Sequence, residues 1–416
     1  MSKTKPFDIS KKIVWEAYKR VKENKGAAGV DGETIEDFEK NLKRNLYKIW
    51  NRMSSGTYFP PAVRCVEIPK EHGKGVRMLG VPTVADRVAQ TVVKMYLEPI
   101  VEPKFHTDSY GYRPGKSQHQ ALTVARKRCW KYDWILDLDI SKFFDNLDHG
   151  LVMDMVKKHT DCKWMLLYIE RWLKAPMKMK DGTLVARDCG SPQGSVVSPL
   201  LSNIFMHEVF DEWMRIKFAS VPFERYADDG LVHCVSEKQA KYLRDAITKQ
   251  LAQYKLELHP EKTRIVYCKD GDRTGSYKHE RFDFLGFTFR PRLSKNRWGK
   301  HFVNFSPAVS DEAAKKIRAT IRGWHIHRCN GKSLSDLARM FNTEVQGWIN
   351  YYGYFYKSAL YPSLSRLNEY LVRWARRKYK KLKRHPTRAR RWLAQIAQRE
   401  PTLFAHWRFG LLQRAG

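Results

Sequence analysis

The chain has 416 residues, of which 43% are hydrophobic and 29% charged, a balance typical of a globular protein of two or three domains and not of a disordered one. Its formal net charge of +33 and pI near 9.8 indicate a polyanionic partner, nucleic acid, rather than a merely soluble basic protein. The seven cysteines form no CxxC pair, so neither a zinc site nor a disulfide framework is expected. No signal segment or membrane-length apolar run occurs, and a cytoplasmic location, which in bacteria includes the nucleoid, is expected.

The first three hundred residues mix helical and strand patterns. Residues 8–55 have apolar residues at helical spacing, interrupted by a loop of turn formers at 24–32. Strands are expected at 64–68, 76–80, 132–140, 184–189, 223–227 and 231–235, and helices at 83–100, 148–158, 163–174, 198–218 and 237–254. This order predicts an α+β fold in which an antiparallel sheet is backed by helices.

Beyond residue 300 the pattern becomes helical. Three apolar stripes are expected at 313–324, 337–352 and 364–374; Ser310 is an expected N-cap of the first, and Ser333 with Asp336 forms a capping pair before the second. Residues 366–416 then hold 15 Lys and Arg against 2 Asp and Glu, interleaved with aromatic residues. This part of the chain predicts an all-α domain followed by a nucleic-acid-binding segment.

Two acidic strands carry the chemistry. Asp228 and Asp229 are adjacent in the sequence YADD at the expected tip of a hairpin, where like charges repel each other unless a cation lies between them. Upstream, Asp137 and Asp139 lie on the same face of a strand, so spacing alone does not choose between them. Nucleotidyl transfer uses two divalent ions held by a few carboxylates, which Asp139, Asp228 and Asp229 could supply.

The chain resembles the group II intron-encoded reverse transcriptases, also called maturases, almost from end to end. The blocks that carry the resemblance are NKGAAGVDG (24–32), VEIPKEHGKGVRMLGVPTVADRVAQ (66–90), SYGYRPGKSQHQAL (109–122), DLDISKFFDNLDH (137–149), GSPQGSVVSPLLSNI (190–204), RYADD (225–229), LHPEKT (258–263), FDFLGFTF (282–289) and GWINYYG (347–353). The resemblance implies a right-hand polymerase fold: fingers and palm with an antiparallel palm sheet over 1–300, including an N-terminal extension over 1–60, an all-α thumb or maturase domain over 301–375, and a basic segment over 376–416.

The resemblance also implies roles for single residues around the metal. Asp139 is preferred to Asp137, and the expected metal ligands are Asp139, Ile140, Asp228 and Asp229, with two Mg²⁺ ions that Mn²⁺ could replace. Lys262 matches a position proposed to protonate the leaving pyrophosphate or to order the closed site.

A nucleotide pocket is implied by the same blocks. Phe144 falls at the position of the bulky residue that excludes a 2′-hydroxyl, and Gln193 lies in the loop beside the incoming nucleotide. Lys70 and Arg77 match residues that grip the triphosphate, and Arg113 is a weaker candidate for the same pocket. The expected contacts to the primer or RNA are Tyr226, Asn350, Arg376, Arg377, Lys380, Arg390 and Arg391.

The function implied is that of an RNA-directed DNA polymerase that binds its host intron RNA, assists splicing and copies RNA from a DNA primer with dNTPs after insertion into target DNA. Many members end in a Cys-rich HNH endonuclease; this chain reaches Gly416 without CxxC pairs, so a short form without that nuclease is expected. Two alternatives remain open: a stand-alone reverse transcriptase of repair or phage defence, and a protein that acts mainly as an RNA-binding splicing cofactor. The oligomeric state is also open.

Overall fold

The computed structural model describes residues 5–69 and 75–411, and Lys70 lies outside them. The chain divides into two compact units. The first unit falls within residues 1–117 and 136–264, and the second within 118–135 and 265–416. Both units are therefore built from two separate stretches of sequence. The domain limits expected at residues 300 and 375 stay predictions.

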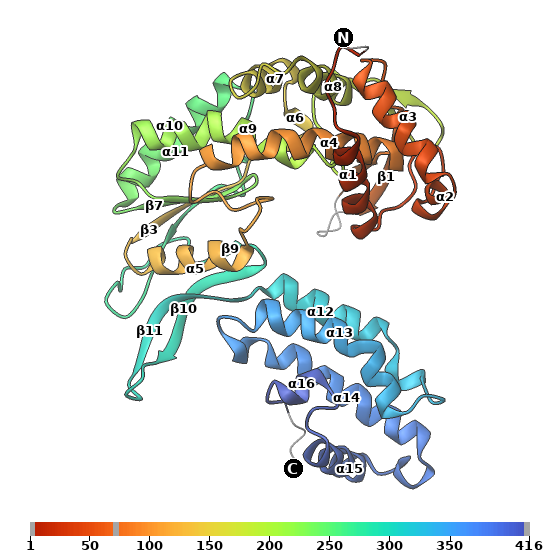
Figure 1. The fold of residues 1–416 in the computed structure, drawn as a ribbon. Helices are drawn as coiled ribbons and strands as arrows, with labels where there is room; N and C mark the ends of the chain where they lie inside the picture. Colours follow the sequence, from red (N-terminus) through yellow and green to blue (C-terminus); the bar gives the residue numbers. More distant parts are fainter. Residues whose placement is uncertain (1–4, 70–74, 412–416) are drawn as a thin grey trace. The chain divides into compact units, whose positions relative to one another are not determined.

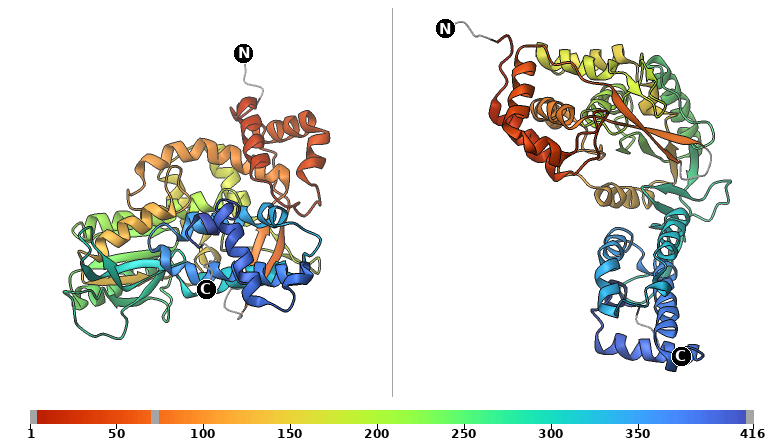
Figure 2. Two further views of the ribbon diagram at one scale, coloured as in Figure 1. Left: turned by 90° about the horizontal axis from the view of Figure 1, so that it is seen from below. Right: turned by 90° about the vertical axis from the view of Figure 1, so that its right-hand side faces the viewer.

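The first unit contains most of the helices that the sequence predicts. Its helices are α1 (Lys11–Glu23), α2 (Ile35–Lys40), α3 (Leu42–Ser54), α4 (Val84–Val101), η1 (Glu102–Lys104), α6 (Phe143–Asn146), α7 (His149–Lys157), α8 (Lys163–Lys174), α9 (Ser198–Met206), the π-helical turn η2 (His207–Asp211), α10 (Glu212–Lys217) and α11 (Glu237–Gln253). α1 and α3 pack against α4 (Figures 1 and 2). α4 is buried along most of its length because Val84, Val88 and Val92 recur at a spacing of four residues.

Two four-stranded sheets accompany these helices. One has the order β2-β1-β4-β5, from β1 (Val63–Pro69), β2 (Val76–Val81), β4 (Met177–Lys178) and β5 (Leu184–Val185). The other has the order β6-β7-β3-β8, from β3 (Trp134–Leu138), β6 (Phe223–Tyr226), β7 (Asp229–Cys234) and β8 (Arg264–Tyr267). β1 pairs antiparallel with β2 and parallel with β4, and β6 pairs antiparallel with β7. Helices α9, α10 and α11 cover one face of the β6–β7 hairpin (Figure 1).

The second unit joins a β-ribbon to a group of helices. It contains α5 (Gln118–Cys129), β9 (Phe282–Phe284), β10 (Phe287–Lys295), β11 (His301–Val309), α12 (Asp311–Gly323), η3 (Ile326–Arg328), α13 (Leu334–Tyr352), η4 (Lys357–Ala359), α14 (Tyr361–Lys378), η5 (Lys380–Leu382), α15 (Pro386–Arg399) and α16 (Ala405–Arg408). β11, β10 and β9 form an antiparallel sheet, and α5 packs against β11 (Figure 1).

One hydrophobic core runs through the helices after residue 310. It includes Ile317 of α12, Val345 of α13 and Trp374 of α14, and it continues into Leu393 of α15 and Trp407 of α16. The basic C-terminal stretch therefore contributes an apolar face to this core, while its arginines and lysines stay at the surface. Figure 2 shows these helices, in blue, packed side by side.

The structure confirms the α+β fold class and most expected elements. The three late helices occur as α12, α13 and α14, with Ser310 as N-cap and Ser333 with Asp336 as a capping box. The expected strand at 184–189 is wrong in length, because only residues 184–185 pair with β4. Helix α5 and the β10–β11 ribbon were not expected from the sequence. Charged residues interrupt the apolar spacing of α5, and the Pro and Gly residues of the ribbon interrupt the alternation expected of strands.

Candidate active site

The acidic pair lies on a tight turn between β6 and β7. Tyr226 pairs with Asp229 in the antiparallel register, so Ala227 and Asp228 form the turn. Ala227 has φ +59°, a left-handed conformation that costs a non-glycine residue about 1 kcal/mol. Such a turn persists only when its surroundings hold it in place.

A buried arginine holds this turn. The Arg225 side chain is 1% exposed and its partner Asp211 is 0% exposed. Arg225 Nε and Nη2 donate to the two carboxylate oxygens of Asp211 at 2.8 and 2.6 Å, while Nη1 donates to the carbonyl oxygen of Ala227 at 2.8 Å. Nη1 also donates to Asn203 Oδ1 at 3.1 Å. The planar guanidinium thus ties the turn to η2 and to α9.

A second loop, from Ser109 to Gly115, lies against the same turn. A Cβ atom on Gly111 would come within 2.3 Å of the backbone nitrogen of Ala227, so only glycine fits there. Next to it, Tyr112 is 53% exposed and its ring centroid lies 6.3 Å from that of Tyr226. Partial desolvation of the side chain, followed by the charge of Asp228, raises the pKa of Tyr112. Tyr112 therefore belongs to the site. The sequence did not single it out, although its neighbours in GYRPG pointed to the loop.

The third carboxylate enters from the end of β3. The backbone oxygen of Asp139 accepts a hydrogen bond from His259 N at 2.7 Å, and Ile140 bridges Leu258. These contacts bring the segment that contains Lys262 beside the strand. Lys262 Nζ lies 3.1 Å from Asp139 Oδ2, with the lysine 58% and the aspartate 27% exposed. The structure thus places the side chains of Asp139 and Lys262 beside each other; their catalytic roles stay predictions.

The three aspartates act on one another electrostatically. Desolvation, followed by repulsion from Asp228 and Asp139, raises the pKa of Asp229 to about 7, although the residue keeps part of its surface open to solvent. Desolvation is also the largest cause of the raised pKa of Asp228, and Asp139 adds to it. Neighbouring carboxylates raise one another's pKa because their negative charges repel, and a bound divalent cation would relieve this repulsion. Among the described residues, no three Asp, Glu, His or Cys side chains stand close enough to form a ready-made metal cage.

Helix α6 carries Phe144, the expected sugar-gate residue, whose role stays a prediction. Phe143 is 2% and Phe144 8% exposed, and their ring centroids are 5.3 Å apart. The backbone oxygen of Phe144 accepts a hydrogen bond from Ser191 N at 2.8 Å. Gly190 has φ +81°, and a Cβ there would lie 3.0 Å from the same oxygen. The Gly190–Gly194 loop is therefore packed directly on α6.

The other end of that loop reaches β2. The side-chain oxygen of Gln193 accepts a hydrogen bond from Arg77 Nε, and its backbone oxygen accepts one from Gly80 N at 2.8 Å. Gly194 has φ +115°, and a Cβ on it would come within 2.7 Å of the Gly80 oxygen. Arg77 and Gln193, both expected at the nucleotide pocket, are thus neighbours in the structure.

A buried carboxylate supports the loop from behind. Gln90 Oε1 accepts hydrogen bonds from Ser195 Oγ at 2.6 Å and Val196 N at 2.8 Å, and Gln90 Nε2 donates to Asp86 Oδ2 at 2.9 Å. Trp172 Nε1 donates to Asp86 Oδ1 at 2.7 Å. Burial raises the pKa of Asp86 to about 6, and these hydrogen bonds oppose the shift. The hydrogen bonds that run from Asp86 through Gln90 to Ser195 and Val196 therefore fix the position of the chain just after the Gly190–Gly194 loop.

Arg113 has another role from the one expected. Its side chain is 6% exposed and forms an ion pair with Glu102, with Nη2 2.8 Å from Oε1. Its Nη1 donates to the carbonyl oxygens of His106 and Ser109 at 2.6 and 2.8 Å. A guanidinium engaged in this way shapes the loop that presents Tyr112, and this geometry does not favour contact with a triphosphate.

The remaining expected nucleic-acid contacts lie in the second unit, except Tyr226. Asn350 is exposed on α13, where its Oδ1 accepts a hydrogen bond from Gln346 Nε2 at 2.7 Å. Arg377, Lys380, Arg390 and Arg391 are exposed, and Arg376 is partly exposed, on or next to α14 and α15. Their roles stay predictions. In the part of the chain that is described, no helix has the length and apolar character that a membrane span requires.

We predict that Arg225→Met lowers the free energy of unfolding by about 3–5 kcal/mol, because Asp211 would stay buried without its counter-ion. Urea denaturation of the full chain measures this loss. Arg215→Met is the matched control, since Arg215 forms an exposed ion pair with Glu212 and its loss costs at most about 1 kcal/mol. Equal losses in the two variants would contradict a clamp at Arg225.

A second prediction concerns pH. The pKa of Asp86 is about 6 in the folded chain against an ordinary value of 3.8, so the folded state binds more protons between these values. The free energy of unfolding should therefore fall, by roughly 2 kcal/mol from this residue, as the pH rises from 4 to 6. Asp86→Asn removes this contribution, so the free energy of unfolding of the variant should rise relative to that of the wild type between pH 4 and pH 7. Urea denaturation at a series of pH values measures the free energy of unfolding of both proteins. If the two free energies change in parallel between pH 4 and pH 7, the assignment to Asp86 is wrong.

Two protein-family models match this chain, and the matched residues include those of the site described above. A family model described as reverse transcriptase (RNA-dependent DNA polymerase) matches residues 68–289, and one described as group II intron, maturase-specific domain matches residues 314–392. Protein YkfC of Escherichia coli (strain K12) is 30% identical over 354 residues, which cover 75% of this chain and 88% of YkfC. Group II intron-encoded protein LtrA of Lactococcus lactis subsp. cremoris is 31% identical over 424 residues, which cover 82% of this chain and 68% of LtrA.

Among solved structures, telomerase from Candida albicans in complex with a fragment of telomeric RNA aligns with a TM-score of 0.48 and 13% identity, covering 90% of this chain and 67% of that one. The first family model spans the three aspartates and the loops packed around them, and the second spans most of the helices after residue 310. The chain therefore belongs to the group II intron-encoded reverse transcriptases, which are RNA-directed DNA polymerases with a maturase domain.

Proposed function

We propose that Asp139, Asp228 and Asp229 form the catalytic centre, where two Mg²⁺ ions support extension of a DNA primer on an RNA template. The observation that carries this proposal is that the three carboxylates lie within electrostatic reach of one another: desolvation, followed by repulsion from Asp228 and Asp139, raises the pKa of Asp229 to about 7, although Lys262 acts in the opposite direction. Bound there, the ions would activate the primer 3′-oxygen and offset the charge of the triphosphate. The backbone of Ile140, next to Asp139, is the remaining expected ligand; Mn²⁺ would be accepted by the same oxygen donors.

Lys262 fits the role of an acid beside this centre. Its ammonium group is paired with Asp139 and the side chain is 58% exposed, so it can reach a group bound at the carboxylates. A positioned proton donor contributes roughly 10²–10⁴-fold to a rate. In this proposal Lys262 gives its proton to the departing pyrophosphate and Asp139 keeps the side chain oriented beforehand.

The incoming nucleotide would lie between Phe144 and the Arg77–Gln193 pair. Arg77 can turn its guanidinium from the side chain of Gln193 to a phosphate, since its hydrogen bond to the neutral amide oxygen is weaker than one to an anion. Phe144 is held by packing against Phe143 and by the backbone contact to Ser191, so its ring cannot easily move aside for a 2′-hydroxyl. Tyr226, on the same turn as Asp228, would contact the primer end. Lys70 would complete the grip on the triphosphate.

Primer extension tests the catalytic centre. Asp228→Ala should abolish extension of a DNA primer on an RNA template with dNTPs and Mg²⁺, because one of three metal-binding carboxylates is lost. Asp245→Ala, which removes an exposed aspartate of α11, is the matched control and should extend as the wild type does. EDTA should stop the wild type, and added Mg²⁺ should restore it. Extension by Asp228→Ala at the wild-type rate would exclude the centre proposed here.

A splicing role belongs to the second unit. The maturase-specific model covers α12 to α14 and part of α15, and the arginines of α14 and α15 stay at the surface while the apolar faces pack inward. We propose that this basic surface, with Asn350, binds host intron RNA and stabilises its fold, and that the polymerase copies that RNA after insertion into target DNA. Residues 1–300 would act as fingers and palm, 301–375 as thumb and 376–416 as the basic extension. Bacterial relatives support a cytoplasmic location.

Splicing and copying should be separable. Asp228→Ala should support intron splicing in vitro as well as the wild type, because the carboxylates take no part in binding RNA. The double variant Arg390→Glu and Arg391→Glu should splice poorly, since it reverses two exposed charges on α15 that would meet phosphates. If the aspartate variant loses splicing while the α15 variant keeps it, the proposed division of roles is wrong.

A further inference from the structure

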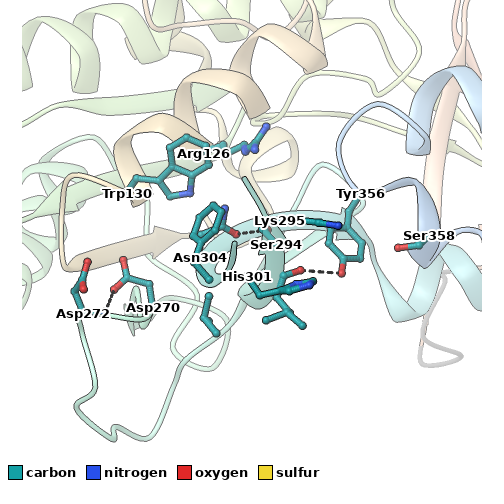
Figure 3. Close-up of a pocket in the computed structure, with 13 residues that line it drawn as sticks. Arg126, Trp130, Asp270, Asp272, Ser294, Lys295, His301, Asn304, Tyr356 and Ser358 are labelled. Carbon is teal, nitrogen blue, oxygen red and sulfur yellow. Dashed lines mark hydrogen bonds between the residues drawn. The ribbon is translucent and has the colours of Figure 1, made fainter. Parts of the chain in front are cut away.

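A pocket lies wholly inside the second unit and outside the catalytic centre. It has a volume of about 740 Å³ and opens between the end of α5 and the β10–β11 ribbon, with the Asp270–Asp272 loop at one side and the Tyr356–Ser358 segment at another. Figure 3 shows Arg126 and Trp130 of the α5 region above the ribbon, and Tyr356 entering from the side opposite Asp270 and Asp272. The volume is within the range of pockets that enclose small organic groups.

Two aromatic side chains in its wall are held in fixed positions. The indole Nε1 of Trp130 donates a hydrogen bond to the carbonyl oxygen of Phe305 at 2.8 Å, and the hydroxyl of Tyr356 donates to that of Leu293 at 3.1 Å. Trp130 is nevertheless 43% exposed. An aromatic ring that is anchored by its polar edge while it stays accessible to solvent is suited to stacking on another flat ring.

Cationic groups surround these rings. The guanidinium of Arg126 lies 4.5 Å from the Trp130 ring centroid, and its Nε is buried without a hydrogen-bond partner among the described residues. Arg292 stands 5.4 Å from the Tyr356 ring centroid. Lys295 and His301 line the pocket from the ribbon. Arg126 and Lys295, which both line the pocket, thus offer cationic groups to an anionic ligand.

The acidic residues lie at the other side. Asp270 is already compensated, because Arg273 Nε donates to its Oδ2 at 2.9 Å and the contact lowers the pKa of Asp270 against the effect of burial. Asp272 lines the same side, next to Asp270 (Figure 3). A ligand with an anionic group and a ring that bears N–H donors would match both sides of the pocket. A nucleotide has this combination of groups in one unit, whereas the anionic side chains of a peptide, Asp and Glu, have no ring.

We propose that this pocket binds one unpaired nucleotide of a single-stranded RNA, with its base stacked on Trp130 or Tyr356 and its phosphate at Lys295 and Arg126. The inference rests on the proposed function only in that the enzyme handles RNA. It adds a contact site to the polymerase centre and to the basic surface of α14 and α15. Its use would be to hold a strand that has unpaired bases, since a base within a duplex cannot enter the pocket.

Binding of RNA by the full chain tests this site. Fluorescence anisotropy with a labelled oligouridylate, without primer, dNTP or divalent metal, should show about a fivefold to hundredfold loss of affinity for Trp130→Leu, because base stacking is lost. Lys295→Gln should weaken binding and reduce the slope of log K against log salt by about 0.7. Lys295 is exposed, so this second variant tests the pocket even if Trp130→Leu folds poorly. With 4-thiouridine in the RNA, photocrosslinks should map to Trp130 or Tyr356.

The matched controls are Trp298→Leu and Lys300→Gln, which remove an exposed aromatic and an exposed cation from the tip of the same ribbon without touching the pocket lining. They should bind RNA as the wild type does. Equal losses in controls and pocket variants, or unchanged affinity in Trp130→Leu and Lys295→Gln, would overturn the proposal. Wild-type primer extension with Mg²⁺ tests the polymerase centre separately, since the binding assay contains no metal.

Discussion

The buried ion pair between Arg225 and Asp211 is the interaction on which the acidic turn depends. A left-handed alanine followed by two aspartates is unfavourable in backbone conformation and in charge. Arg225 offsets both costs, because it binds the Ala227 carbonyl directly and places a fixed positive charge behind the turn. Its own burial is tolerated only because Asp211 lies opposite in bidentate geometry. The positions of the carboxylates on the turn are thereby set by the fold of the chain itself.

Close contacts between backbone segments fix the positions of the other loops around the acidic turn. Gly111 meets the turn, Gly190 meets α6, and Gly194 meets β2, each at a distance that leaves no room for a side chain. The Ser109–Gly115 loop and the Gly190–Gly194 loop, far apart in the sequence, are therefore each packed by their backbone against the backbone of a neighbouring element. The Asp86–Gln90 network then fixes the loop that carries Gln193. A polymerase centre built in this way owes its geometry to packing of the main chain more than to side-chain contacts.

Much of this fold was predictable because local signals were strong. α8 begins and ends where its apolar spacing predicted, and α12 and α13 begin at the expected caps. The signals were weak for α5, whose last turn is basic, and for the β10–β11 ribbon, where Pro291 and exposed cations break the alternation. Those two elements form the walls of the pocket assigned to RNA. No local pattern in the sequence indicates this pocket, because its lining comes from four separate segments.

The sequence by itself determined the fold class, the adjacent aspartates and the order of blocks that identifies the family, because these depend on residue type and spacing along the chain. Only the tertiary structure decided which polar groups meet. Arg113 turned toward Glu102, Tyr112 entered the site, and Asp86 became the support of a loop over a hundred residues away. Such partnerships depend on which groups become desolvated together, and desolvation is a property of the packed chain rather than of any short stretch of it.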